Sequence, residues 1–341
     1  MLDANRSALP PVLFVGDHLG YPGGVAHGVT TYLLEVLPSL RAAGVELAVV
    51  FLRGPHEAAR QLRRHGIDPV FYDAPRLDPT VALRVVHAAR AHGSRLIHAA
   101  GIKATLVARL AARATGARAL LHVHDRIVPG PAVARLHAAL ARPSDLGICV
   151  AGGVRDVAIH GYHVSPERVR VVPNGIALAR VREVKADARA RLRAGFGMAH
   201  DAPLIGVVGR LFPVKGQRGL LRVWPQIRAA VPGARLLVIG DGPDRAACEA
   251  EARARGCAGS VAFLGQRADV PDLLHAVDLV LVPSESEGLP ICAIEALCVG
   301  RPVVAYDVGG VCEVVDDGRN GVVVPAADGA AIARAVVALL R

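Results

Sequence analysis

Residues 279–295 read LVLVPSESEGLPICAIE, an apolar run followed by an acidic loop and a helix-like pattern. The four apolar residues at 279–282 are typical of a strand that is buried on both faces of a sheet. Pro290 stands where a helix would begin, and apolar residues recur at helical spacing after it. A strand, a loop and a helix in this order form one unit of an α/β fold.

The same unit recurs along the whole chain. Short apolar runs that alternate with helical patterns predict strands at 12–16, 45–52, 70–72, 96–99, 119–123, 146–150, 169–172, 204–209, 235–239, 261–264, 279–282, 303–306 and 322–324. Continuous apolar strands separated by helices indicate parallel sheets covered on both faces. We therefore expect two doubly wound, Rossmann-like α/β domains that face a central cleft.

Length and composition agree with two domains. The chain has 341 residues, of which 52% are hydrophobic, enough for two cores. A charged, helix-prone segment at 181–193 interrupts the series of strands. The expected organisation is an N-terminal domain over 1–175, a linker over 176–200 and a C-terminal domain over 201–341.

The net charge of +10 admits nucleic acid, an anionic membrane or phosphorylated substrates as partners. Aromatic residues make up only 4% of the chain, so the stacking surfaces typical of single-strand and RNA binders are not expected. Nucleic-acid binding is therefore only a minor alternative. Lysine is scarce, with three lysines (Lys103, Lys185 and Lys215) among forty basic residues.

Location and redox state follow from simple features. Residues 1–11 are polar and end in two prolines, which is unlike a secretory leader, and no apolar run is long enough to cross a bilayer. The expected location is the cytoplasm. The cysteines form no CxxC pair, so reduced thiols without a disulfide or a structural metal are expected at Cys149, Cys248, Cys257, Cys292, Cys298 and Cys312.

Two features follow strands of the first half. Gly23-Gly24 precede a helical pattern, where backbone amides can approach an anion, although an ordinary tight turn is the better explanation of a Gly-Gly pair taken by itself. The spacing is not that of the dinucleotide fingerprint GxGxxG. The run LHVHD at 121–125 places His122 and His124 on one face if the strand continues, and His124 lies at the carboxyl end, where ligands bind. A purely structural role is the alternative for either histidine.

In the second half, Arg210 and Lys215-Gly216 lie in a short loop after the strand at 204–209. Two cations there can converge on a diphosphate, whereas the alternative is an ordinary pair of surface charges. Glu287 precedes the expected helix, whose first amides favour a phosphate. Glu295 lies among apolar residues and needs a partner, and hydroxyl groups of a sugar suit both carboxylates.

Together, Gly23-Gly24, Gly209-Arg210 with Lys215-Gly216, the run Gly240-Asp241-Gly242-Pro243 and the Glu287-x7-Glu295 pattern resemble the retaining GT-B glycosyltransferases of family GT4. The resemblance spans nearly the whole chain. It implies a hexosyltransferase that moves a sugar from a nucleoside-diphosphate sugar to a glycan, lipid-linked or small-molecule acceptor, as in polysaccharide biosynthesis. It further implies retained anomeric configuration, no metal, and no cofactor besides the nucleotide sugar as co-substrate.

The resemblance also implies residue roles. Glu287 and His124 would face the transferred sugar as catalytic residues. The donor-binding residues would be Arg210 and Lys215 on the diphosphate, Gly288 and Leu289 on phosphate through amides, Glu295 on the ribose, Arg267 near the base, and Gly23 and Gly24 closing on the diphosphate.

Three alternatives stay open. A GT-B nucleotide-sugar epimerase shares these features, and a non-catalytic donor-binding homologue is the second alternative, because family members usually continue past 330–340 with a final crossover helix that we expect to be lacking here. Peripheral contact with the inner membrane face through the basic stretch at 133–142 is the third. The base, the sugar, the acceptor, the linkage and the oligomeric state are not specified by the sequence.

Overall fold

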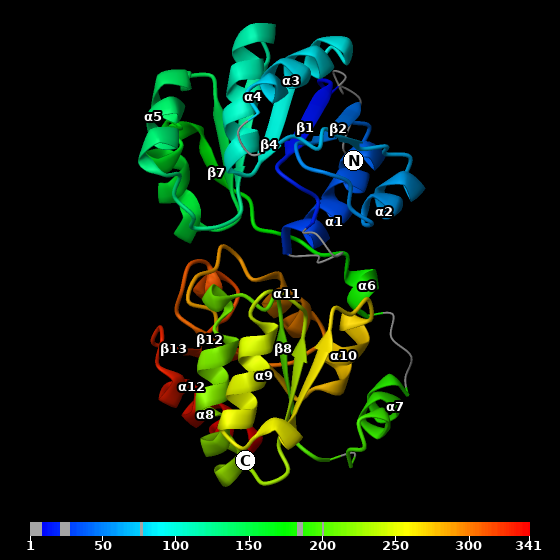
Figure 1. The fold of residues 1–341 in the computed structure, drawn as a ribbon, viewed down its shortest axis with the longest axis vertical. Coiled ribbons are helices and arrows are strands. Elements are labelled where there is room, and N and C mark those ends of the chain that lie inside the picture. Colours follow the sequence, from blue (N-terminus) through cyan, green and yellow to red (C-terminus); the bar gives the residue numbers. More distant parts are fainter. Residues whose placement is uncertain (1–8, 21–27, 76–77, 183–186, 200) are drawn as a thin grey trace. The chain divides into compact units, whose positions relative to one another are not determined.

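The computed structural model describes residues 9–20, 28–75, 78–182, 187–199 and 201–341. The chain divides into two compact units, Met1–Pro173 and Asn174–Arg341, here called unit 1 and unit 2 (Figure 1). Each unit is described by itself. The predicted Gly23 and Gly24 lie outside the described residues.

Unit 1 contains a seven-stranded, all-parallel sheet in the order β3-β2-β1-β4-β5-β6-β7. The strand order reverses between β1 and β4, as in a Rossmann-like sheet. The strands are β1 (Val12–Gly16), β2 (Leu47–Phe51), β3 (Val70–Phe71), β4 (Leu96–Ala100), β5 (Arg118–Val123), β6 (Leu146–Cys149) and β7 (Val169–Val171). All seven predicted strands of this half are present.

Helices lie on both faces of this sheet. Leu33 and Leu37 of α1 and Leu62 of α2 form a core with Phe14 of β1 and Phe51 of β2. On the other face α3 packs against α4, and α4 packs against β4 and β5 (Figure 1). The helices are α1 (Gly28–Ala42), α2 (Ala59–Arg64), α3 (Thr80–Ala91), α4 (Ile102–Thr115) and α5 (Pro131–Leu140).

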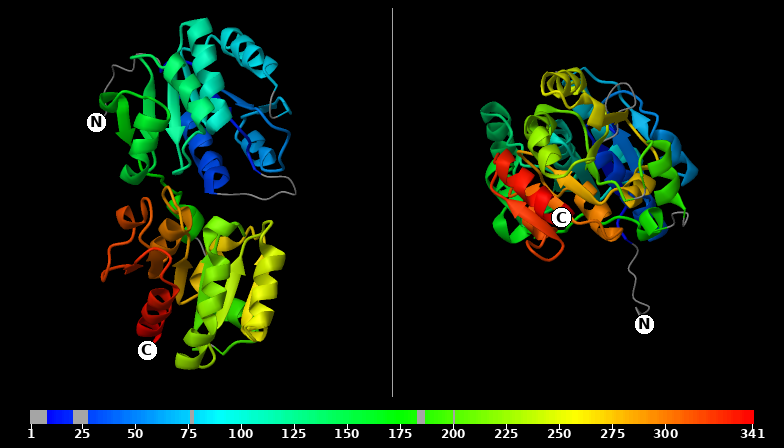
Figure 2. Two further views of the ribbon diagram at one scale, coloured as in Figure 1. Left: turned by 60° about the vertical axis from the view of Figure 1, so that its left-hand side comes forward. Right: turned by 90° about the horizontal axis from the view of Figure 1, so that it is seen from below.

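Unit 2 repeats this architecture with six parallel strands in the order β10-β9-β8-β11-β12-β13. The strands are β8 (Leu204–Val208), β9 (Arg235–Ile239), β10 (Val261–Gly265), β11 (Leu279–Val282), β12 (Val303–Tyr306) and β13 (Gly321–Val324). The helices are α6 (Leu178–Arg182), α7 (Ala188–Gly195), α8 (Gln217–Ala230), α9 (Arg245–Ala254), α10 (Val270–Ala276), α11 (Ile291–Cys298) and α12 (Gly329–Leu340). Figure 2 shows the sheet of each unit between its helices, so the predicted pair of doubly wound domains is confirmed.

The segment expected to be a linker, 176–200, contains a helix that packs on unit 2. The Asp278 carboxylate accepts hydrogen bonds from Arg189 at 2.6 Å, from Arg193 at 2.7 Å and from the Leu204 amide at 2.8 Å. Burial raises the pKa of Asp278, but these hydrogen bonds outweigh it and leave the pKa below its ordinary value. The α7 helix is thereby attached to unit 2 at the amino ends of the inner strands β8 and β11.

Two further findings concern the whole described chain. No helix within the described ranges is long and apolar enough to cross a membrane. All six cysteines are free thiols.

Candidate functional site

The loops that follow β8 and β9 are joined through their backbones. The Leu211 amide donates to the Asp241 carbonyl at 3.0 Å, and the Gly209 amide donates to Ile239 at 2.9 Å. Gly240 has a φ of +133°, and a Cβ at this position would overlap the Gly209 carbonyl oxygen. Glycine is therefore required where these two loops approach each other.

The loop after β8 is also joined to the loop after β11. A 3-10 turn at Pro213–Lys215 ends at Gly216, which has a φ of +71° and precedes α8. A Cβ on Gly216 would overlap the carbonyl oxygen of Pro283, the residue that follows β11. The Glu285 amide donates to the Val214 carbonyl at 2.8 Å. The backbone thus fixes the position of Lys215 relative to the acidic loop.

Lys215 and Glu287, both predicted site residues, are in contact. The Lys215 ammonium donates to the Glu287 carboxylate at 2.6 Å. The Lys215 side chain is 24% exposed and that of Glu287 is 10% exposed. A cation and a carboxylate therefore lie side by side at the carboxyl end of the sheet, where open α/β sheets bind ligands.

The helix α11 begins directly behind this pair. Pro290 is its N-cap, Gly288 and Leu289 are buried, and the Gly288 carbonyl accepts from the Gly310 amide at 2.8 Å. The first amides of a helix have no partner within the helix, and its positive dipole end favours an anion. Glu295, a turn and a half into α11, is only 6% exposed.

Cys292 lies between these residues and was not predicted as part of the site. Burial is the largest cause that raises the pKa of its thiol, the Glu287 and Glu295 carboxylates also raise it and Lys215 lowers it, which together bring the pKa to about 12. All three predicted residues therefore lie within electrostatic range of one thiol. The only signal in the sequence was its position between the two glutamates.

Arg210 and Arg267 have partners on their own loops. The Arg210 guanidinium lies over the Phe212 ring, 4.8 Å from its centroid, and the Arg210 carbonyl accepts from Gln217 at 3.0 Å. Arg267 follows β10 and forms a bidentate ion pair with Asp269, in which two guanidinium nitrogens donate to the two carboxylate oxygens at 2.7 and 2.6 Å. The Arg267 side chain is exposed, and it pairs with Asp269 rather than with a residue of the Lys215–Glu287 group.

In unit 1, His124 directly follows β5, at the carboxyl end as predicted. Its ring stacks on that of His122, with centroids 4.0 Å apart and planes inclined by 26°, so the two histidines share one side of the strand. His122 is buried and His124 is partly buried. Burial lowers the pKa of His124 to about 3, and it lowers the pKa of His122 well below the ordinary value.

A third histidine joins this stack and was missed from the sequence. His98 on β4 lies with its Nε2 3.1 Å from Nδ1 of His122, and the two rings are stacked with centroids 5.3 Å apart. Burial lowers the pKa of His98 to about 4. Only the pairing of β4 with β5 brings these side chains together, and this neighbour relationship is not encoded in either strand alone.

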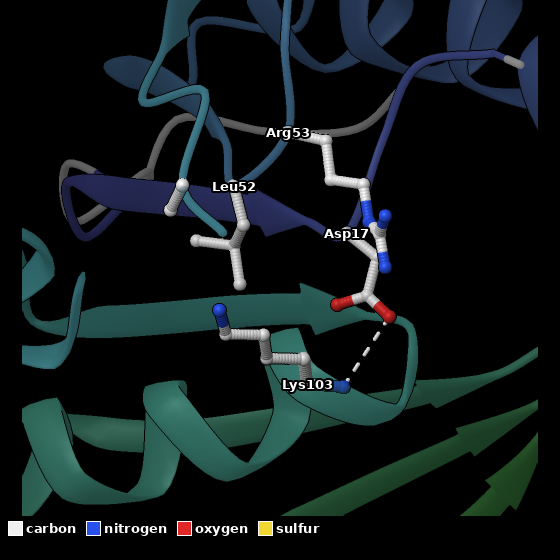
Figure 3. Close-up of a pocket in the computed structure, with 5 residues that line it drawn as sticks. Asp17, Leu52, Arg53 and Lys103 are labelled. Atoms are coloured by element: carbon white, nitrogen blue, oxygen red, sulfur yellow. Dashed lines mark hydrogen bonds between the residues drawn. The ribbon is translucent and has the colours of Figure 1, made fainter. Parts of the chain in front are cut away.

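Unit 1 also has a small pocket beside the point where its strand order reverses (Figure 3). Asp17, Leu52, Arg53, Ala74 and Lys103 line it. The Asp17 carboxylate, which follows β1, accepts from the amides of Lys103 at 3.3 Å and Ala104 at 2.5 Å, at the start of α4. Burial raises the pKa of Asp17, although these amides lower it in part. The pocket combines an acceptor for hydroxyl groups with two cations.

Among the residues that the structure describes, no three His, Cys, Asp or Glu side chains gather in a way that could hold a metal ion.

Comparison with protein families matches both units. Residues 26–180 match the model described as Glycosyltransferase Family 4, and residues 202–341 match Glycosyl transferases group 1. The two matches cover most of unit 1 and most of unit 2.

Several curated proteins are similar in part. A D-inositol 3-phosphate glycosyltransferase of Segniliparus rotundus is 38% identical over 170 residues, which are 48% of this chain and 37% of that protein. A GDP-mannose-dependent alpha-(1-6)-phosphatidylinositol monomannoside mannosyltransferase of Mycolicibacterium smegmatis is 39% identical over 163 residues, 45% of this chain and 42% of that protein. The matched part thus spans well under half of these relatives.

Solved structures are similar over nearly the whole chain. HepE of Anabaena, determined in complex with UDP-glucose, is 25% identical, with a TM-score of 0.84 over 98% of this chain and 90% of that one. Sucrose-phosphate synthase of Thermosynechococcus elongatus shares the fold, with 21% identity and a TM-score of 0.79 over 97% of this chain and 90% of that one. The two parallel α/β sheets are those of the GT-B fold.

Proposed function

We propose that this chain, which belongs to the GT4 glycosyltransferases (Glycosyltransferase Family 4 over unit 1 and Glycosyl transferases group 1 over unit 2), transfers a hexose from a nucleoside-diphosphate sugar to an acceptor hydroxyl with retention of the anomeric configuration. The observation that carries this proposal is the contact between Lys215 and Glu287 in front of α11. It pairs a group that can bind a diphosphate with a group that can bind sugar hydroxyls.

The donor occupies the carboxyl end of the unit 2 sheet. Lys215, Arg210 and the amides of Gly288 and Leu289, which directly precede the N-cap of α11, stabilise the negative charge that grows on the departing diphosphate. With these cations and amides the reaction needs no metal. Lys215 then exchanges its contact with Glu287 for one with phosphate, which leaves the carboxylate to accept from hydroxyl groups of the sugar.

The remaining donor roles follow the GT4 pattern. By this pattern Glu295, which is 6% exposed on α11, accepts from the ribose hydroxyls. Arg267 reaches the base after leaving Asp269, an exchange that its exposure permits. Gly23 and Gly24 approach the diphosphate through their amides, and His124 meets the transferred sugar.

The acceptor is a polyol, which we assign to unit 1. The relatives named above act on inositol 3-phosphate and on a phosphatidylinositol mannoside, and both compounds join hydroxyl groups to a phosphate. The Asp17 pocket suits this chemistry, since the carboxylate accepts from a hydroxyl while Arg53 and Lys103 attract an anionic substituent. By this proposal the enzyme has no cofactor and acts in the cytoplasm.

Peripheral contact with an anionic inner membrane face is a second proposal for unit 1. Ile127 and Val128 are 58% and 61% exposed, and on α5 Leu136 is 50% exposed beside the exposed Arg135. Exposed apolar and basic side chains together favour an anionic lipid surface. Co-sedimentation with phosphatidylglycerol vesicles but not with phosphatidylcholine vesicles supports this contact, and equal pelleting with both contradicts it.

The function is tested by product analysis. Purified protein is incubated with UDP-glucose or GDP-mannose and a set of polyol acceptors in the presence of EDTA, and the product is examined by proton NMR. The proposal predicts an α-linked product from these α-linked donors. Conversion of the donor alone into a second nucleotide sugar indicates the epimerase alternative, and donor binding without any product indicates a non-catalytic homologue.

A further inference from the structure

Three histidines from two neighbouring strands form one stack at the carboxyl end of the unit 1 sheet. His98 of β4 shares a hydrogen bond with His122 of β5 at 3.1 Å. The His122 ring in turn stacks on that of His124, with centroids 4.0 Å apart. Of the three residues, His98 and His122 are nearly inaccessible, at 7% and 4% exposure. Only His124 lies beyond the end of its strand.

Aromatic rings hold the stack from the side. Tyr32 of α1 meets the rings of His122 and His124 edge-on, with centroids 5.3 and 5.1 Å away. Phe14 of β1 meets His98 in the same manner at 5.2 Å. Edge contacts of this kind favour one ring plane over others. The plane of the His124 ring is therefore set by two neighbours, one stacked on it and one meeting it edge-on.

The hydrogen bond between His98 and His122 constrains both the protonation and the rotation of their rings. In a neutral imidazole one nitrogen donates and the other accepts, so the bond requires that one of its two nitrogens, Nε2 of His98 or Nδ1 of His122, carries a proton and that the other does not. It also opposes rotation of the His122 ring. A rotated His122 would remove the flat surface on which His124 stacks.

The charge state of the stack follows from its surroundings. His124 and His98 both lower the pKa of His122, and His98 lowers the pKa of His124. The other titratable side chain in contact with His124 is Tyr32. Burial is the largest cause of the low pKa of all three histidines. At pH 7 the three rings are neutral.

His124 nevertheless has an unmet hydrogen-bonding requirement. Its Nε2 is buried and has no hydrogen-bond partner among the described residues, and the same is true of Nε2 of His122. A buried polar atom without a partner destabilises the folded chain, because it has lost its hydrogen bonds to water. An imidazole held in one orientation, with one nitrogen unsatisfied at the carboxyl end of a strand, is suited to a ligand hydroxyl.

We propose that His98 and His122 are positioning residues, which hold the His124 ring in the one orientation that lets its Nε2 meet a hydroxyl of the transferred sugar. This inference rests on the role proposed above for His124. It adds that His124 acts as a neutral hydrogen-bonding group whose orientation is set by residues that never touch the substrate. Simple filling of the core is the competing explanation for His98 and His122.

The test compares turnover in four variants. His122→Ala removes the stacking surface, His122→Phe keeps an aromatic surface without the nitrogen atoms, and His98→Leu removes the hydrogen bond. His87→Ala, at an exposed position of α3, is the control. We expect His122→Ala to lower kcat by about tenfold or more, because small displacements of a catalytic group are costly. The donor KM should change less than threefold, and His122→Phe should recover part of kcat.

A second measurement needs no turnover. Histidine ring signals of protein labelled with 13C-histidine are followed by NMR between pH 4 and 8, and the His124 signal is identified by its absence in His124→Ala. In the wild type this signal should not titrate above pH 5. In His122→Ala water reaches the ring, its pKa rises toward 6.5, and activity at pH 6 should fall relative to activity at pH 8.

The outcomes distinguish a failure of the proposed role of His124 from a failure of the positioning role of His98 and His122. If His124→Ala turns over normally, the proposed role of His124 is wrong. If His124→Ala is slow while His122→Ala keeps the wild-type kcat and the wild-type His124 titration, the positioning role is overturned and the proposed function survives. A His122→Ala variant that unfolds is replaced by His98→Leu, for which the same NMR shift is expected and an unchanged titration contradicts the proposal.

Discussion

The Lys215 ammonium lies 2.6 Å from the Glu287 carboxylate, although 72 residues separate them in the chain. Both residues are fixed by their loops, since Gly216 lies against Pro283 and Glu285 donates to Val214. A pair that is partly exposed adds little net stability. In the proposed function, the pair holds a cation and a carboxylate at the start of α11, where a diphosphate and a sugar replace the contact between them.

The first prediction concerns Lys215. Lys215→Ala removes a cation from the proposed diphosphate site and should weaken binding of a nucleotide sugar by about tenfold or more, since a hydrogen bond to a charged group contributes about 1.5–3 kcal/mol. Isothermal titration calorimetry measures the effect. Arg228→Ala, at an exposed position of α8, should bind as the wild type does. Equal affinity in the Lys215 and Arg228 variants would contradict the assignment.

A second prediction separates the two acidic residues of the E-x7-E pattern from the neighbouring Glu285. Glu295→Gln should weaken binding of the nucleoside diphosphate, which carries the ribose, as well as of the complete donor. Glu287→Gln should weaken binding of the complete donor more than of the nucleoside diphosphate, because the proposed role of Glu287 is to bind the sugar. Glu285→Gln is the matched control, since this side chain is exposed on the same loop. A Glu295→Gln variant with normal nucleotide affinity would remove the ribose role.

The third prediction tests the close contact behind Lys215. Gly216→Ala places a Cβ on the Pro283 carbonyl oxygen at a φ of +71° and should destabilise unit 2 by about 1–2 kcal/mol or more. Gly219→Ala lies in open space inside α8 and should stabilise it by about 0.5–1 kcal/mol. Urea unfolding followed by the fluorescence of Trp224, the single tryptophan, reports both changes. Equal stability of the two variants would contradict the prediction, because it would show that the loop shifts to make room for the added Cβ.

The fourth prediction is a loss of stability of unit 1 at mildly acidic pH. The histidines at 98, 122, 124 and 137 have pKa values lowered mainly by burial, to about 4, well below 6.5, about 3 and about 4. The unfolded chain therefore binds more protons than the native chain below pH 6.5. The contribution of these histidines to stability is fully present above this pH. It falls as the pH drops toward 4, by up to about 1.4 kcal/mol for each pH unit and each histidine.

The measurement for this prediction uses two signals. Urea unfolding at pH 7.5 and pH 5.5 is followed by circular dichroism, which reports both units, and by Trp224 fluorescence, which reports unit 2. The unfolding transition of unit 1, which only circular dichroism detects, should depend on pH. The transition of unit 2, which Trp224 fluorescence reports, should depend on pH much less. His122→Phe should reduce it. A unit 1 transition that is independent of pH over this range would refute the prediction.

Local sequence patterns predicted the elements better than the contacts between them. The strands at 12–16 and 279–282 were correct because a continuous apolar run between turn residues has few alternatives. The placement of His124 after β5 followed from the same rule. The doubly wound architecture then followed from strand and helix alternation.

What was missed depends on which strands are neighbours. His98 joins His122 because β4 pairs with β5, and Asp17 caps α4 because β1 pairs with β4. The sequence of a single strand does not show which other strand pairs with it. Gly101 fits this arrangement, with a φ of +110° and no room for a Cβ beside the Asp17 carboxylate. Cys292 was overlooked because a lone thiol in a helix reads as a core residue.

The central claim is that unit 2 binds a nucleotide sugar through Lys215 and Glu295. The most direct test is a calorimetric titration of the wild type, Lys215→Ala and Glu295→Gln with UDP-glucose, GDP-mannose and ADP-glucose. We predict that the wild type binds at least one of these donors and that both variants bind it at least tenfold more weakly. Binding of unchanged affinity in both variants, or the absence of binding of all three donors to the wild type, would contradict the account.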